Sequence, residues 1–233
     1  MPLYAGADRM MQLNLTDTAS ITDPAIIEKI NGLFALQQQY SAAIKEVRTK
    51  LEILDDEFHM KFDHNPIHHM EYRLKSPSSI FEKLRRRNLP MTIEAIRENL
   101  FDVAGVRVIC NYKDDIYRIA DLLVAQDDIR LLKTKDYIAY PKENGYRSLH
   151  LVIEVPVFLS EERRVTPVEV QIRTIAMDFW ASLEHQLKYK ATGEVPSYVR
   201  DELYDCAVAI ADIDERMQRI YRKLYATDEA WRD

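Results

Sequence analysis

The chain has 233 residues, of which 47% are hydrophobic and 30% are charged, and its formal net charge is −6. This length fits one domain with appended helices, or two small domains, and the composition is that of a globular protein with a sizeable core. The acidic balance argues against nucleic acid as the main partner, although a local basic pocket could still hold a small anionic ligand.

No stretch approaches the roughly 18 apolar residues that a membrane-spanning helix needs. The first twenty residues lack the basic start and apolar core of a signal peptide, so we expect a cytoplasmic protein with no membrane partner. Cys110 and Cys206 lie far apart within apolar patterns. Their spacing fits neither a metal site nor a disulfide framework, and we expect both to be buried thiols in a reducing compartment.

Residues 1–21 show no sustained periodicity and are predicted to form a mobile arm. Asp23 and Pro24 are typical of a helix start, with an N-cap followed by proline in the first turn. Apolar residues then recur at helical spacing over 24–58, which predicts one helix, or two that separate near Gly32.

The rest of the chain alternates short strands with helices. Strands are predicted at 103–110, 129–135, 148–156 and 165–172, and helices at 78–87, 92–99, 116–125, 176–190 and 197–225. In the last strand Glu169, Gln171 and Arg173 alternate with aliphatic residues, which predicts one polar and one apolar face. The predicted fold is α+β, a mixed sheet of about five strands flanked by helices. It forms a single domain over 22–233 with its core at about 60–190.

Six basic residues gather in the segment 73–87, RLKSPSSIFEKLRRR. The chain has only five glycines and no glycine-rich phosphate loop, so side chains must hold any phosphate. A guanidinium group binds a phosphate through two N–H donors at once, and lysine neutralises the charge of a phosphate. This segment is therefore a candidate triphosphate site. The candidate ligands are Arg73, Lys75, Ser79, Lys83 and Arg86, of which the last three share one helix face. A solvated basic helix face is the alternative that this segment leaves open.

Asp102 immediately precedes the apolar strand VAGVRVIC, which carries Arg107 in its middle. A carboxylate beside a group of cations is a candidate Mg²⁺ ligand, although a helix or turn cap is equally compatible with this position. An arginine inside an apolar strand is costly unless it is paired or lines a site. The guanidinium of Arg107 could therefore stack on a purine.

The loop DYIAYPKENGYRSLH, residues 136–150, holds an aromatic residue among cations. Tyr146 offers a flat face for a base, and Lys142, Arg147 and His150 could hold the phosphates of the same nucleotide. For Tyr146 alone, a partly buried core position is the competing interpretation.

Glu169 could ligate a metal or accept a proton from an attacking hydroxyl, or it could be a structural partner of Arg173. Asp178 on the following helix could accept hydrogen bonds from a guanine edge. The cluster of His59, His64, His68 and His69 matches no zinc spacing, and its role stays open.

Four ordered motifs resemble the synthetase domain of the RelA/SpoT family over roughly residues 40–225. They are RLKSPSSIFEKLRR, FDVAGVRVIC, DYIAYPKENGYRSLH and VEVQIRT. The resemblance implies a nucleotidyltransferase-like fold with long terminal helices. Short length points to the stand-alone small alarmone synthetases, and HNPIHHME and VICNYKDDIY are most similar to the P-type branch. Such enzymes transfer the β,γ-pyrophosphate of ATP to the 3′-hydroxyl of GDP or GTP, giving AMP and the stress-response alarmones ppGpp or pppGpp.

The family's residue roles can be carried over by motif. Arg73 and Arg107 would sandwich adenine, and Lys75, Lys83 and Arg86, with Ser79 beside them, would hold ATP. Asp102 and Glu169 would bind Mg²⁺, and Glu169 would also activate the 3′-hydroxyl. Tyr146 would stack on guanine, Lys142 and His150 would grip the acceptor phosphates, and Arg147, Gln171 and Asp178 would complete the GDP/GTP site. The resemblance also implies a homotetramer built through the terminal helices.

Two alternatives remain at this point. The same chemistry could act on adenosine nucleotides or on the 3′ end of tRNA, although the chain shows no added basic patch for tRNA. A non-catalytic nucleotide- or RNA-binding module is the other, and the presence of both carboxylates argues against it.

Overall fold

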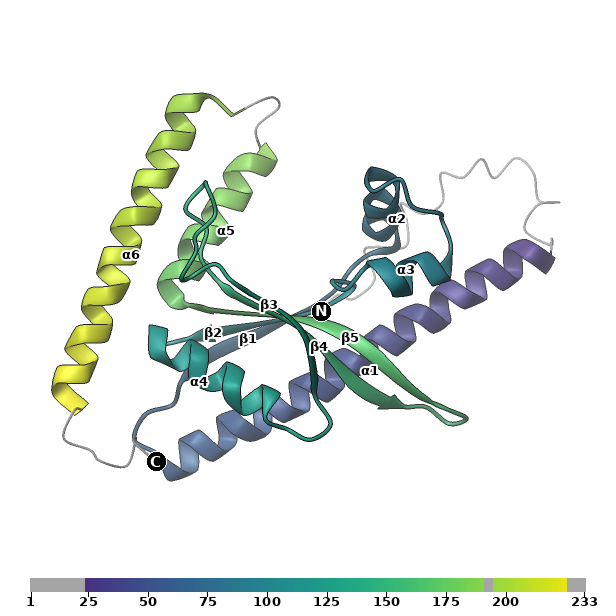
Figure 1. Ribbon diagram of the computed structural model, residues 1–233, viewed down its shortest axis with the longest axis horizontal. Helices are drawn as coiled ribbons and strands as arrows, with labels where there is room; N and C mark the ends of the chain where they lie inside the picture. The colour runs from purple at the N-terminus through teal and green to yellow at the C-terminus, as the bar shows by residue number, and fades with distance from the viewer. Residues whose placement is uncertain (1–23, 191–194, 226–233) are drawn as a thin grey trace.

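The computed structural model describes residues 24–190 and 195–225, so the arm predicted over 1–21 lies outside the described residues. In chain order the elements are α1 (Pro24–Lys61), β1 (Ile67–Leu74), α2 (Pro77–Arg86), α3 (Ile93–Asn99), β2 (Ala104–Cys110), α4 (Lys113–Val124), β3 (Arg130–Asp136), β4 (Leu149–Phe158), β5 (Arg163–Thr174), α5 (Ile175–Lys190) and α6 (Ser197–Tyr225) (Figure 1).

The strands form one five-stranded sheet in the order β1-β2-β5-β4-β3. β2 and β5 run parallel, and the other neighbours are antiparallel. The predicted α+β class with a mixed sheet is thereby confirmed. Four strands lie where apolar runs predicted them, but the sequence did not locate β1. This strand is at the edge of the sheet and exposes most of its side chains, so it lacks the apolar run typical of a central strand.

The N-terminal helix α1 packs across one face of the sheet as a single continuous helix. Leu36, Val47 and Leu51 are fully buried in the main core. Gly32 does not break the helix. A Cβ atom there would lie 2.5 Å from Ile93 of α3, so the glycine allows these two helices to approach closely.

The remaining helices are distributed around the sheet so that α2 and α3 lie at one end and α5 and α6 at the other (Figure 1). Ser76 caps α2, since its hydroxyl accepts a hydrogen bond from the backbone N–H of Ser79. Ile80 and Leu84 bury one side of α2 in the core. This packing fixes the orientation of the helix and so the direction of Lys83, the residue before Leu84.

The C-terminal helix α6 packs on the domain through a stripe that includes Ala207, Asp214 and Gln218, all buried. Cys206 lies beside this stripe and is exposed, whereas Cys110 is buried in β2. The prediction of two buried thiols was therefore wrong for Cys206. None of the helices in the described ranges has the length and hydropathy of a membrane span.

Candidate active site

The sheet face opposite α1 carries a row of polar side chains that crosses all five strands. The register aligns Glu71 of β1, Arg107 of β2, Gln171 of β5, His150 of β4 and Lys135 of β3. Side chains that are aligned in this way point to the same face of a sheet. The row therefore joins residues that lie far apart in the sequence into one continuous polar surface.

The neighbouring row aligns Arg73, Gly105 and Glu169. A cavity of about 220 Å³ opens at this row, lined by Glu71, Tyr72, Arg73, Lys75, Asp102, Gly105, Val106, Arg107, Glu169 and Gln171. A Cβ atom on Gly105 would lie 3.6 Å from the carbonyl oxygen of Arg73, an ordinary contact. The glycine therefore leaves open the space that a longer side chain would fill.

This cavity brings together both predicted metal ligands and three predicted ATP ligands. Asp102 enters it from the turn before β2, and the ammonium groups of Lys75 and Lys83 each lie 2.5 Å from its Oδ2 atom. Burial alone would raise the pKa of Asp102, but the hydrogen bonds from these two lysines lower it. Asp102 is therefore an ionised residue of the site, and the alternative of a helix or turn cap is not what the structure shows.

The two carboxylates of the cavity fit a hard divalent cation. The Oδ1 atom of Asp102 is buried and has no hydrogen-bond partner among the described residues. Glu169 lines the same cavity, and the negative charge of Asp102 acts to raise its pKa. Mg²⁺ typically takes one or two carboxylates together with phosphate oxygens, and these two residues would supply them.

Glu169 is held on the polar face of β5 by two neighbours. Its Oε2 atom accepts a hydrogen bond from Gln171 at 2.9 Å, and its Oε1 atom lies 3.4 Å from Nδ1 of His150. Burial alone would raise the pKa of Glu169, but the hydrogen bonds from His150 and Gln171 lower it below the usual value. The prediction that β5 has one polar and one apolar face is confirmed, since Val168, Val170 and Ile172 are fully buried.

The structural pairing of Glu169 with Arg173, which the sequence left open, is not formed. Arg173 instead donates to the Oε1 atom of Gln171 at 3.1 Å and lies 3.4 Å from Asp178 of α5. Arg107 approaches the same Asp178 oxygen at 3.7 Å and also donates to Glu71 at 2.7 Å. These contacts connect the cavity on β1 and β2 with the start of α5.

Arg173 is a site residue to which the sequence analysis gave a place on the polar strand face but no ligand role. Only 3% of it is exposed, and its guanidinium lies 5.8 Å from the ring centre of Tyr146. A buried arginine is costly without partners. The signal that could have identified it is its place on the polar face of β5, two residues after Gln171.

The predicted base-stacking loop lies beside this network. The ring of Tyr146 packs against Trp180, Ala181 and Ala207, so both interpretations of this residue hold in part: it is half-buried and it faces the site. The ammonium group of Lys142 lies 4.6 Å from the ring centre of Tyr146. The loop thus presents an aromatic ring with a cation close to it.

Gly145 allows this loop to rest on α6. Its φ of 85° is in the region that favours glycine, and a Cβ atom there would lie 2.5 Å from the Cβ atom of Ala207. Asn144 fastens the loop to α5 through a hydrogen bond to Glu184 at 2.9 Å. The conformation of the loop therefore depends on both C-terminal helices.

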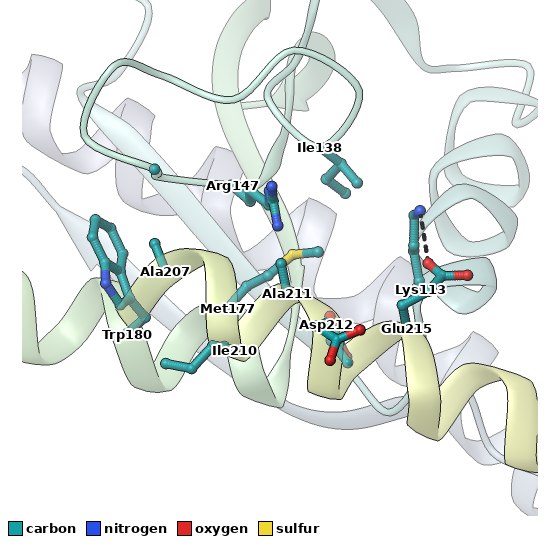
Figure 2. Close-up of a pocket in the computed structure, with 12 residues that line it drawn as sticks. Lys113, Ile138, Arg147, Met177, Trp180, Ala207, Ile210, Ala211, Asp212 and Glu215 are labelled. Carbon is teal, nitrogen blue, oxygen red and sulfur yellow. Dashed lines mark hydrogen bonds and ion pairs between the residues drawn. The ribbon is translucent and has the colours of Figure 1, made fainter. Parts of the chain in front are cut away.

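Arg147 does not join the other predicted acceptor ligands. Figure 2 shows that it points from the loop into a separate cavity of about 350 Å³ between the loop and α6, where Met177, Ala211 and Asp212 are neighbours. Across this cavity Lys113 pairs with Glu215 at 3.2 Å (Figure 2). The side chain of Arg147 turns away from the face that holds His150 and Glu169, so the structure does not support its assignment to the acceptor phosphates.

Two predicted ATP ligands on α2 also lie outside the cavity as it stands. Ser79 forms a hydrogen bond with Ser76 at 2.9 Å, and Arg86 is exposed in the last turn of the helix. Their predicted roles require a triphosphate that extends from the cavity along α2, and they stay predictions.

The four histidines of the N-terminal region do not form one cluster. His64 lies 3.0 Å from the carboxylate of Asp115, His59 contacts Asn65, and His68 and His69 contact each other on β1. Within residues 24–190 and 195–225, no three His, Cys, Asp or Glu side chains are grouped as a metal site.

Comparisons with known proteins agree with the motifs. The family described as "Region found in RelA / SpoT proteins" matches residues 72–194. The chain is 44% identical over 185 residues to the GTP pyrophosphokinase YwaC of Bacillus subtilis strain 168, and the alignment covers 79% of this chain and 88% of that relative.

Solved structures give the same result. Small alarmone synthetase 1 from Bacillus subtilis bound to its product pppGpp matches with a TM-score of 0.74 and 37% identity, covering 79% of this chain and 94% of that one. The same enzyme bound to AMPCPP matches with a TM-score of 0.72 and 33% identity, covering 84% and 98%. Placement in the P-type branch stays a prediction. The fold, the motifs and these similarities together show that the chain belongs to the RelA/SpoT family.

Proposed function

We propose that this protein is a GTP pyrophosphokinase that transfers the β,γ-pyrophosphate of ATP to the ribose 3′-hydroxyl of GDP or GTP. The products are AMP and ppGpp or pppGpp. The observation that carries the proposal is the cavity that Asp102 and Glu169 line together with the arginines of β1 and β2. His150, which contacts Glu169, links this cavity to the ring of Tyr146. Relatives named as GTP pyrophosphokinases, at 44% and 38% identity over most of this chain, support it.

The donor half of the site is built from β1, β2 and α2. Arg73 and Arg107 flank the open position at Gly105, where a flat adenine ring would lie between two guanidinium planes. Lys75 and Lys83 are close to the cavity and would shift from Asp102 towards the phosphates of ATP. Transfer of a phosphoryl-type group needs positioning and charge neutralisation more than covalent chemistry, and these cations supply both.

The acceptor half is built from β4, β5 and the loop. Tyr146 would stack on guanine, and Lys142 would neutralise the acceptor phosphates from its place above the same ring. Asp178 would meet the guanine edge only by sharing its carboxylate with Arg107 and Arg173. Glu169 would take the proton of the 3′-hydroxyl, because it is the ionised carboxylate on the polar face of β5.

Asp102 and Glu169 are the residues that would hold Mg²⁺. Bound there, the ion would neutralise phosphate charge between the two nucleotides. Two features favour it: the Oδ1 atom of Asp102 has no hydrogen-bond partner among the described residues, and both carboxylates line one cavity. Removal of divalent metal with a chelator is expected to stop product formation, and added Mg²⁺ to restore it.

Thin-layer chromatography of labelled ATP with GDP, GTP, ADP or tRNA as acceptor tests the proposal directly. A labelled guanosine tetra- or pentaphosphate is expected with GDP or GTP. A product formed only with ADP or tRNA would assign a different acceptor, and no product with any acceptor would leave a binding module.

Glu169→Gln tests the assignment of the base. General-base catalysis contributes about 10²–10⁴-fold, so a rate loss of that size is expected while both nucleotides still bind. Glu161→Gln is the matched control, since Glu161 is exposed in the hairpin between β4 and β5. A near wild-type rate in the Glu169 variant would show that another residue takes the proton.

We also expect a homo-oligomer, in line with the predicted tetramer. Apolar side chains on α6, including Ile213, Met217 and Ile220, are half exposed in the single chain. Light scattering of the purified protein measures the assembly. A cytoplasmic location, where ATP and guanine nucleotides are available, stays a prediction.

A further inference from the structure

A series of contacts leads from the loop at residues 136–150, here called the acceptor loop, to Glu169. It passes through the side chains of Tyr146 and His150. The hydroxyl of Tyr146 lies 2.9 Å from Nε2 of His150, and Nδ1 of the same imidazole lies 3.4 Å from Oε1 of Glu169. His150 is only 9% exposed. Both of its ring nitrogens are therefore engaged inside the protein, one on the side of the loop and one on the side of the carboxylate.

We propose that Tyr146 and His150 form a relay that orients Glu169, so that the residue which stacks on the acceptor base also aligns the catalytic carboxylate. This inference rests on the proposed function, and it changes the predicted role of His150 from a phosphate ligand to a positioning residue. His150 can bind a phosphate only by giving up one of its two contacts.

The geometry selects one tautomer of His150. When the Tyr146 hydroxyl donates to Nε2, the ring proton is on Nδ1 and points to Glu169. The opposite tautomer would place an unprotonated Nδ1 against the carboxylate, which is repulsive. A hydroxyl can donate to an imidazole nitrogen, whereas a phenylalanine at this position would leave Nε2 without its donor and the ring held only by Glu169.

The groups that face His150 come from the neighbouring strands and from the loop that bears Tyr146. Lys135 of β3 and Gln171 of β5 are its register partners, and the ring of Tyr137 meets it edge-on at 5.2 Å. Lys142 and Arg173 both lie against the ring of Tyr146. Among the described residues, Glu169 is the one carboxylate within 4 Å of the ring nitrogens of His150.

In the reaction, the 3′-hydroxyl proton moves to Glu169 as the new O–P bond forms at the β-phosphorus. The bond from that phosphorus to the α,β-bridging oxygen breaks, and its electron pair leaves with AMP. His150 keeps its Nδ1 proton throughout and holds the carboxylate in place. When guanine stacks on Tyr146, the same tyrosine thus holds, through His150, the carboxylate of Glu169 that activates the 3′-hydroxyl of that guanine nucleotide.

Tyr146→Phe separates the two roles of the tyrosine, because it keeps the aromatic face and removes only the hydroxyl. We expect kcat to fall about 10-fold or more, as for a loosely positioned general base, with KM for GDP and for ATP within about twofold of wild type.

His150→Asn and His150→Ala form a matched pair. The Nδ2 atom of asparagine takes the place of Nδ1 and can still donate to Glu169, whereas alanine cannot. The relay predicts that the asparagine variant recovers most of the kcat that the alanine variant loses. Equal losses in both, or a Tyr146→Phe enzyme with unchanged kcat, would overturn the inference.

An NMR measurement keeps this result separate from a failure of the proposed function. In protein labelled with ¹⁵N-histidine, the His150 signals, assigned by their loss in His150→Asn, should show a single Nδ1-protonated tautomer. The Nε2 signal should shift in Tyr146→Phe, where the hydroxyl that donates to Nε2 is gone. An Nε2-protonated ring in wild type would refute the relay. If wild type makes no alarmone yet shows this tautomer, the proposed function fails while the contact chain stands.

Discussion

Gly145→Ala is expected to weaken acceptor binding selectively, because it acts where the loop rests on α6. At a φ of 85°, a side chain costs about 1–2 kcal/mol in the left-handed region. The new Cβ atom would lie 2.5 Å from that of Ala207, whereas carbon atoms in contact lie about 3.5–4.0 Å apart. The loop must therefore move by roughly 1 Å, and Tyr146 moves with it.

The free-energy cost translates into a change of affinity. A loss of about 2 kcal/mol corresponds to a roughly 30-fold weaker complex, since 1.4 kcal/mol is tenfold. Titration calorimetry with GDP alone and with ATP alone should show this loss for GDP and little change for ATP. Among the described residues, the lining of the donor cavity includes none from this loop.

Ala207→Gly supplies the matched control. In the double variant the steric collision disappears and only the backbone cost of the alanine at 145 remains, so part of the GDP affinity should return. Ala207→Gly alone should destabilise α6 by about 1 kcal/mol without changing the loop. Equal losses of GDP and ATP binding, or no recovery in the double variant, would refute the dependence of the loop on α6.

Three further predictions concern the donor half and the core. Gly105→Val should fill the cavity and weaken ATP binding at least tenfold in calorimetry. Gly105→Ala, whose Cβ meets only an ordinary contact, should lose much less ATP affinity. Similar ATP affinities in the two variants would show that ATP does not use this space. Lys83→Met should destabilise the protein by about 1 kcal/mol at pH 7, after allowance for partial exposure of the ion pair. Because the folded-state pKa of Asp102 is lowered, this difference should shrink as the pH falls through that pKa, and a pH-independent difference in urea titrations would contradict the ion pair. Leu51→Ala, at a fully buried position, should lower the free energy of unfolding by about 2–5 kcal/mol. Ile53→Ala, on the exposed side of the same helix, should lower it by less than about 0.5 kcal/mol. Chemical denaturation checks this ranking.

The sequence predicted those parts of the fold in which burial imposes a pattern. The apolar runs of β2, β4 and β5 and the helical stripes of α1 and α6 were located to within a few residues. β1 was missed because an edge strand alternates exposed polar residues with few buried ones. Cys206 was placed wrongly because a helix stripe that is one residue off reverses the prediction of burial.

Within the candidate site, the sequence did not show in which direction each side chain points. The motifs named Asp102, Glu169 and Tyr146 as neighbours, but nothing in them shows that Arg147 turns towards α6. The sharing of one Asp102 oxygen by two lysines depends on the packing of α2 against the turn before β2. Such contacts are set by tertiary packing, and spacing in the chain does not encode them.

Because the acceptor loop rests on α6, the acceptor half of the site can be completed only after α6 has been translated. A nascent chain that has emerged up to Thr174 contains all five strands and both carboxylates, yet it lacks the helix on which Gly145 rests. A chain that is truncated before α6 is therefore expected to lack a fixed position for Tyr146 and to make little or no alarmone.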